Sequence, residues 1–68
     1  MKVLVIGLGS IGKRHIRNII ANTDHTPIGF DVDDSARKFV ETEYGIKTTE
    51  NLEEGINESE VCFICSPN

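Results

Sequence analysis

The fold of this chain is decided by the stretch VLVIGLGSIG, which runs from Val3 to Gly12. A run of apolar, mostly β-branched residues ends at Gly7, and two further glycines follow at Gly9 and Gly12. This is the G-x-G-x-x-G spacing, and it falls where a buried strand is expected to turn into a helix. Such a turn brings the backbone close to a phosphate group, so the stretch predicts a nucleotide-binding unit.

Each position in this turn has its own expected role. Gly7 would make the tight turn out of the strand, and Gly9 would let the backbone approach a pyrophosphate with no Cβ in the way. Gly12 would let the helix pack closely on the strand. The amides of Ser10, Ile11 and Gly12 are expected to be unpaired at the helix start, where the helix dipole favours an anion.

Length and charge restrict the class of protein. The chain has 68 residues, which suffices for one small domain over residues 1–68. Its formal net charge is −4, with 11 acidic residues spread along the chain, which argues against a nucleic-acid partner. It contains no apolar run long enough to span a membrane, and its start lacks a signal-peptide cleavage site. We therefore expect a cytoplasmic protein with no membrane partner.

Strands and helices are predicted to alternate along the chain. Apolar runs predict four strands, which span Lys2–Ile6, Pro27–Val32, Ile46–Thr48 and Val61–Cys65. Helical spacing and end signals predict three helices, which span Ser10–Ala21, Ser35–Tyr44 and Asn51–Ile56. Alternation of this kind predicts an α/β fold, a parallel sheet in the order 3-2-1-4 with helices on both faces. That arrangement is a partial Rossmann fold, in which ligands bind between strands one and four.

The helices carry recognisable ends and inner faces. Asp33 or Asp34 is expected to cap the second helix, Gly45 to end it, and Thr49 to cap the third. Apolar residues at helical spacing predict the inner face of the first helix, formed by Ile11, Ile16, Ile19 and Ile20. The same spacing predicts the inner face of the second helix, formed by Ala36, Phe39, Val40 and Tyr44.

An acidic residue at the end of the second strand completes the nucleotide-binding pattern. Asp31 lies nineteen residues after the last glycine, where the pattern places an acid that binds the adenosine ribose hydroxyls. A carboxylate there, with Asp33 and Asp34 nearby, repels a 2′-phosphate, so NAD is favoured over NADP. Arg37-Lys38 opposes this preference, because a basic pair one turn further could reach a phosphate. Asp31 could also be only a turn residue or a helix cap.

Two further groups of residues have both structural and functional interpretations. Lys13 is expected to lie on solvated helix surface, whereas Arg14 and His15 could equally contact phosphate or solvent. Cys62 and Cys65 form C-x-x-C, but residues three apart on a strand point to opposite faces, so they can neither pair nor share a metal ion. We expect both cysteines to be buried small apolar residues, and we expect no metal site.

Together these residues make the chain similar to the N-terminal domain of the Gfo/Idh/MocA oxidoreductases. The resemblance covers almost the whole chain and rests on the stretches Gly7–His15, Asp31, Gly45–Thr49, Leu52–Glu54 and Glu60–Asn68. Glu60 stands where an aspartate is usual, and Ser66 where a threonine is common. The resemblance implies an NAD- or NADP-dependent oxidoreductase that acts on sugars, cyclitols or related polyols.

The resemblance also assigns residues to the cofactor. It implies that the pyrophosphate lies against Gly9–Gly12, the ribose against Asp31, and the nicotinamide side against Cys65, Ser66, Pro67 and Asn68. The family's catalytic Glu-Lys-Pro motif and its substrate domain are absent from the sequence, so we expect a fragment with no catalytic residues of its own. The alternative is a nucleotide-sensing regulatory module, whereas methyltransferases prefer a different glycine spacing. The fourth strand is expected to have an exposed edge, which would favour a homo-oligomer.

Overall fold

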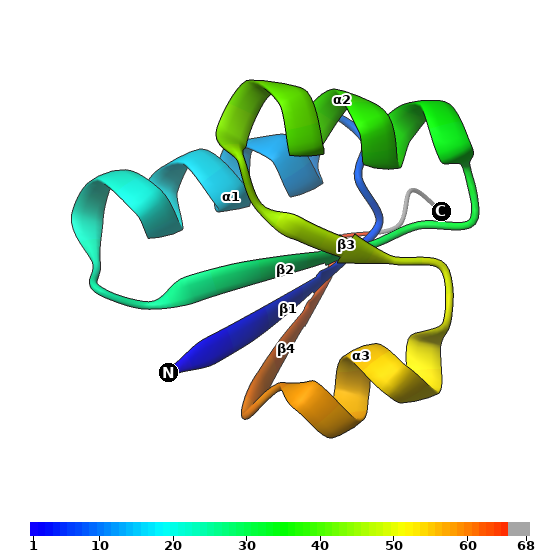
Figure 1. Ribbon diagram of the computed structural model, residues 1–68. Coiled ribbons are helices and arrows are strands. Elements are labelled where there is room, and N and C mark those ends of the chain that lie inside the picture. Colours follow the sequence, from blue (N-terminus) through cyan, green and yellow to red (C-terminus); the bar gives the residue numbers. More distant parts are fainter. Residues whose placement is uncertain (66–68) are drawn as a thin grey trace.

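The computed structural model describes residues 1–65, which form a parallel sheet with helices on both faces (Figure 1). Within this range four strands lie in the order β3-β2-β1-β4 and span Lys2–Ile6 (β1), Thr26–Phe30 (β2), Lys47–Thr49 (β3) and Val61–Ile64 (β4). The helices in the same range span Ser10–Asn22 (α1), Asp34–Tyr44 (α2) and Leu52–Glu58 (α3). The predicted α/β fold and its strand order are confirmed.

The distribution of the helices follows from the direction of the connections. β1, β2 and β3 succeed one another toward one edge, and the chain then returns to β4 on the other side of β1. Parallel connections share one handedness, so a reversal of direction moves the connecting helix to the opposite face. Accordingly, α1 and α2 cover one face of the sheet and α3 covers the other (Figure 1).

β1 is covered on both faces, as its continuous apolar run predicts. Val3, Leu4 and Val5 are all 3% exposed or less. Val3 and Val5 belong to the core cluster beneath α1 and α2, whereas Leu4 lies so close to α3 that a Cβ on Gly55 would be 3.0 Å from its Cδ1. The strand that carries the glycine turn is therefore the most deeply buried element.

The inner face of α1 is narrower than predicted. Ile16 and Ile19 are buried in line with Gly12, but Ile11 and Ile20 are 55% and 46% exposed. At roughly 100° per residue, Ile11 and Ile20 lie on either flank of the line through Gly12, Ile16 and Ile19. The prediction that all four isoleucines face inward is wrong for these two.

α2 has the predicted ends. Asp33 is its N-cap and accepts a hydrogen bond from the Ser35 amide, and Gly45 ends it in the left-handed region at φ 66°. Val40 is fully buried and Tyr44 packs against the core, but Phe39 is 43% exposed and its predicted burial is wrong. The Phe39 ring lies on the α1 side of the helix, where the Lys13 ammonium sits 4.0 Å from its centroid.

Several predicted boundaries need correction. β2 ends at Phe30, and Val32 is 78% exposed in the loop that follows. β3 begins at Lys47 and includes Thr49, so Thr49 cannot cap the next helix. Asn51 caps α3 by accepting a hydrogen bond from the Glu54 amide, because the Thr49 hydroxyl is occupied by the amide of Asn51 itself.

β4 is more exposed than its sequence suggests. It pairs with β1 alone among the described strands, and each of its four residues is exposed, with Phe63 at 42% and Ile64 at 78%. Cys62 is exposed, so its predicted burial is wrong, whereas Cys65 is buried just after the strand. Both cysteines are free.

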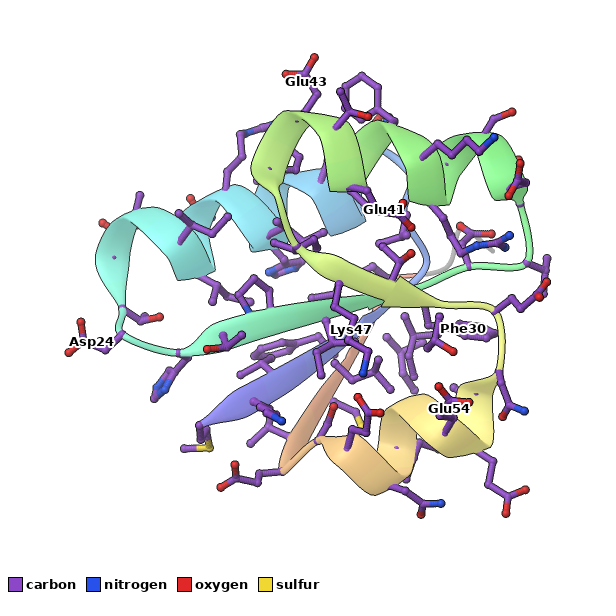
Figure 2. All side chains as sticks on the ribbon, viewed as in Figure 1. Asp24, Phe30, Glu41, Glu43, Lys47 and Glu54 are labelled. Carbon is purple, nitrogen blue, oxygen red and sulfur yellow. The ribbon has the colours of Figure 1, made fainter. Side chains whose placement is uncertain are left out.

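Charged side chains lie on the outer surfaces. Glu43 points away from α2 into solvent, and Lys47 of β3 donates to Glu58 of α3 at 2.8 Å (Figure 2). Among residues 1–65, no group of three or more acidic, histidine or cysteine side chains could hold a metal ion. The same residues form no helix long and apolar enough to cross a membrane.

Candidate functional site

The glycine turn is held between the two strands that flank β1. Gly7 has φ 96°, a conformation that side chains disfavour, and its amide donates to the carbonyl oxygen of Phe30 at 2.9 Å. On the other side the Cys65 amide donates to the carbonyl oxygen of Ile6 at 2.7 Å. The turn between β1 and α1 is thus fixed from β2 and from the end of β4.

Gly12 brings α1 into direct contact with this turn. A Cβ on Gly12 would lie 1.9 Å from the carbonyl oxygen of Gly7 and 3.6 Å from Cγ1 of Val5. No side chain fits there, because the first of these atoms belongs to the backbone. The expected role of Gly12 in close helix packing is therefore visible in the geometry.

Gly9 faces open space. A Cβ built on it would meet nothing within 4 Å, and although Gly9 is the N-cap of α1, no side chain caps the helix. Its carbonyl oxygen accepts from the Lys13 amide at 2.9 Å. Within residues 1–65, the amides of Ser10, Ile11 and Gly12 donate no hydrogen bond. Unpaired amides at the positive end of a helix dipole suit an anion such as a pyrophosphate.

Asp31 lies beside the turn and binds its backbone. Oδ2 of Asp31 accepts from the Leu8 amide at 2.9 Å, and Oδ1 accepts from the Asp33 amide at the same distance. A carboxylate has about four acceptor positions, so each oxygen keeps capacity for a ligand hydroxyl. Burial raises the pKa of Asp31, but the bonds from the Asp33 and Leu8 amides outweigh it and the net pKa is lowered. Asp31 is therefore a carboxylate at neutral pH.

Two clefts meet at Gly9. The first, of about 400 Å³, lies toward β2 and is lined by Ile6, Gly7, Leu8, Gly9, Phe30, Asp31 and Val32. The second, of about 290 Å³, lies toward β4 and is lined by Gly9, Ser10, Ile11 and Cys65. An elongated ligand can therefore lie across the turn, with one part in each cleft and its centre over the free amides.

The structure brings most of the expected site residues together. Gly7, Gly9, Ser10, Ile11 and Asp31 all line one of the two clefts. Cys65 lines the second cleft, where burial raises the pKa of its thiol. Gly12 lines neither cleft, and Ser66, Pro67 and Asn68 lie outside the described part of the chain.

The basic residues after the turn lie around α1. Lys13 lies over the Phe39 ring, and the His15 ring stacks on Phe63 of β4 with their centroids 5.5 Å apart. Arg14 is exposed. None of these side chains lines either cleft.

Sequence reasoning missed several residues of the site. Leu8 is 1% exposed and donates its amide to Asp31, and Val32 lines the first cleft although it lies outside β2. Arg37 does not reach toward the clefts, because its guanidinium binds the carbonyl oxygen of Asp31 at 2.8 Å. The sequence places Arg37 six residues after Asp31, but it does not indicate the direction in which the Arg37 side chain points.

A third hollow does not suit a phosphate ligand. It has a volume of about 490 Å³ and lies along α3, where Asn51, Glu53, Glu54, Asn57 and Glu58 line it. Its three carboxylates would repel a pyrophosphate, whereas the free amides at the start of α1 attract one. The clefts beside the glycine turn are therefore the candidate site.

Sheet, turn and acid together define the first half of a dinucleotide-binding Rossmann fold. The chain belongs to the Gfo/Idh/MocA oxidoreductase family with an NAD-binding Rossmann fold, whose family model matches residues 1–68. A comparison with curated protein sequences gave no significant match.

Solved structures show the same fold. Two crystal structures of apo scyllo-inositol dehydrogenase from Lactobacillus casei, one of them at 77 K, are each 25% identical to this chain, with a TM-score of 0.80. The crystal structure of myo-inositol 2-dehydrogenase from Lactobacillus plantarum is 23% identical, with a TM-score of 0.78. The matches cover 98% of this chain and 21% of each dehydrogenase chain, so residues 1–68 span about a fifth of those proteins.

The residues present fit a dinucleotide. The open space at Gly9 and the unpaired amides at the start of α1 leave room and donors for the pyrophosphate. Asp31 offers acceptors for ribose hydroxyls, and the second cleft lies on the side of Cys65. A bound nicotinamide dinucleotide would supply hydride-transfer chemistry, and these residues would bind and orient it.

Proposed function

We propose that this chain binds NAD across the glycine turn, as the cofactor-binding part of an oxidoreductase that acts on cyclitols, sugars or related polyols. The proposal rests on one observation: two clefts share Gly9 as a lining residue, next to the free amides of Ser10 to Gly12, and Asp31 lines one of them. The family match and the inositol dehydrogenase neighbours support the substrate class. They also favour this function over a nucleotide-sensing regulatory module.

The proposed preference for NAD over NADP rests on charge. Asp31 lines the first cleft as a carboxylate, and the exposed Asp33 and Asp34 follow it directly. A 2′-phosphate next to these groups would be repelled, whereas the ribose hydroxyls of NAD can donate to Asp31.

Cofactor binding and turnover are separate properties of this chain. Hydride transfer requires a substrate site and a positioned proton acceptor, and neither cleft contains a histidine or lysine side chain. We infer that residues 1–68 bind the cofactor without turning it over. Reduction of NAD by this chain in the presence of an inositol would overturn that inference.

Binding is tested by titrating the chain with NAD and following its backbone amides by NMR. The largest shifts are expected at Ser10 to Gly12, and Asp31→Asn should weaken NAD binding about tenfold, as for a lost hydrogen bond to a charged group. Asp24→Asn is the matched control, because Asp24 is exposed in the loop between α1 and β2 (Figure 2). Absence of shifts at these amides, or equal weakening by the control, would contradict the proposal.

Self-association through β4 is a second proposal, supported by the exposure of its apolar residues. Phe63 and Ile64 are 42% and 78% exposed on a strand that pairs with β1 alone within the described residues. An apolar strand edge of this kind favours pairing with another chain. A homo-oligomer would bury these side chains.

The proposed cytoplasmic location is supported by the cysteines. Cys62 and Cys65 are both free, and Cys62 is exposed. Free thiols are typical of reducing compartments. Recovery of the protein from a secreted or membrane fraction would contradict this location.

A further inference from the structure

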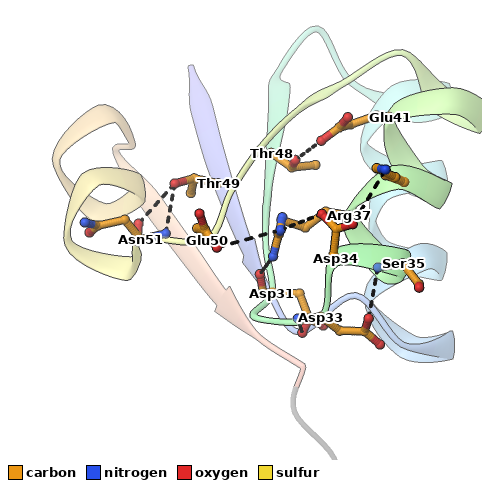
Figure 3. Close-up of polar contacts among 11 residues, drawn as sticks. Asp31, Asp33, Asp34, Ser35, Arg37, Glu41, Thr48, Thr49, Glu50 and Asn51 are labelled. Carbon is orange, nitrogen blue, oxygen red and sulfur yellow. Dashed lines mark hydrogen bonds and ion pairs between the residues drawn. The ribbon is translucent and has the colours of Figure 1, made fainter.

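Arg37 occupies an unusual position for a charged side chain. It lies in α2, yet its side chain is only 12% exposed, whereas the acids around it, Asp34 and Glu50, are 68% and 76% exposed. Its Nη1 donates to the backbone oxygen of Asp31 at 2.8 Å, and its Nη2 lies 2.9 Å from Oδ1 of Asp34 (Figure 3). Oε2 of Glu50 is 3.8 Å away.

The guanidinium therefore joins three segments at one end of the sheet. Asp31 follows β2, Asp34 begins α2, and Glu50 follows β3. A single arginine can serve three partners because its donors form a rigid planar fork. A charge removed from water this far requires such partners, since an unpaired buried cation is strongly unfavourable.

Arg37 also binds the backbone of Asp31. The carboxylate of Asp31 binds the amides of Leu8 and Asp33, and Arg37 holds the carbonyl oxygen of the same residue. Backbone and side chain of Asp31 are thus fixed from both sides. Removal of Arg37 would leave the carbonyl oxygen without this donor.

We propose that Arg37 is a positioning residue that aims Asp31 at the ribose, and that Asp34 and Glu50 make it specificity-determining by keeping its charge away from a 2′-phosphate. The proposal rests on the proposed function, because it assumes that the ribose lies in the cleft beside Asp31. An arginine near this position is the group that accommodates the 2′-phosphate of NADP. In this chain that arginine is already bound to two carboxylates and a carbonyl oxygen.

Positioning is tested first in the chain without nucleotide. Arg37→Met keeps most of the apolar stem and removes the charge, and Arg37→Lys keeps the charge without the fork. In Arg37→Met, the Leu8 amide resonance, which reports the bond to Asp31, is expected to move, and Arg37→Lys should restore part of the change. An unchanged Leu8 resonance in Arg37→Met would overturn the positioning role, whether or not the chain binds NAD.

Specificity is tested by the ratio of NAD to NADP dissociation constants. Arg37→Met is expected to weaken NAD binding about tenfold without strengthening NADP binding. The double variant Asp34→Asn/Glu50→Gln frees Arg37, and the NAD/NADP preference should fall about tenfold more than when the same two substitutions are made in Arg37→Met, where only the direct repulsion by the acids is lost. The control double variant Asp24→Asn/Glu43→Gln makes the same change in net charge away from the cleft and should leave the ratio unchanged.

The outcomes separate this inference from the function on which it rests. If the wild-type chain binds neither nucleotide, the proposed function fails and the specificity role fails with it, while the Leu8 resonance still decides the positioning role. If the wild-type chain binds NAD and the two double variants change the ratio equally, only the specificity role is overturned.

Discussion

Gly12→Ala is expected to remove much of the stability of this fold. The added Cβ would lie 1.9 Å from the carbonyl oxygen of Gly7 and 3.0 Å from its carbonyl carbon. Both atoms belong to the backbone, so no side-chain rotation can relieve the contact. α1 would have to move away from β1, and Ile16 and Ile19 would move out of the core with it.

The magnitude follows from the rigidity of the contact. Overpacking a core lowers the free energy of unfolding by about 1–3 kcal/mol where side chains can shift. Because the Gly12→Ala clash is with backbone atoms, we expect a loss at or above the upper end of this range, about 3 kcal/mol. A folded chain of 68 residues has a free energy of unfolding of roughly 3–10 kcal/mol. The substitution therefore removes between a third and all of the stability.

Urea unfolding followed by circular dichroism measures this loss, and Gly9→Ala is the matched control. Gly9 has φ −79°, which alanine adopts freely, and a Cβ there meets nothing within 4 Å. The free energy of unfolding of Gly9→Ala should stay within about 0.5 kcal/mol of wild type or rise slightly, because alanine lowers the conformational entropy of the unfolded chain. Equal unfolding midpoints for Gly12→Ala and wild type would refute the reasoning.

Three further predictions concern stability and assembly. The lowered pKa of Asp31 contributes stability that is fully present above about pH 4, its unfolded pKa, and is lost as pH falls through the folded value. The urea midpoint of the wild-type chain should therefore fall as the pH is lowered, and that of Asp31→Asn should fall less. Parallel plots of midpoint against pH for the two chains would contradict this. Gly45→Ala should destabilise by about 1–2 kcal/mol in thermal unfolding, because Gly45 has φ 66°, and Gly45→Asn by less. Ile64→Lys should shift sedimentation toward the monomer, whereas a monomeric wild-type chain at high concentration would exclude self-association through β4.

Much of the fold is predictable because its signals are local. The apolar run before Gly7, the glycine spacing, the cap at Asp33 and the turn at Gly45 each depend on a few neighbouring residues. Alternation of strands and helices then restricts the sheet to very few topologies. The same local signals identified Asp31 as the acid beside the turn.

The errors arise where burial depends on distant parts of the chain. Helical spacing indicates that Ile11 and Phe39 lie near an apolar stripe, but the neighbouring elements decide which flank of the stripe is covered. The exposure of Cys62 depends on β4 being an edge strand in the described sheet, which its own sequence does not reveal. The role of Arg37 depends on a carbonyl oxygen and on Glu50, both contributed by other segments.

The central position of β1 affects the order in which the chain folds. β1 is synthesised before β4, and Val3 pairs with Val61, 58 positions further along. Contacts between such distant segments form only after a large loop has closed, which slows folding relative to helical proteins. The cleft beside Cys65 can therefore be completed only after β4 has paired with β1. Until then one edge of the most apolar strand stays open, and a newly made chain can aggregate through it.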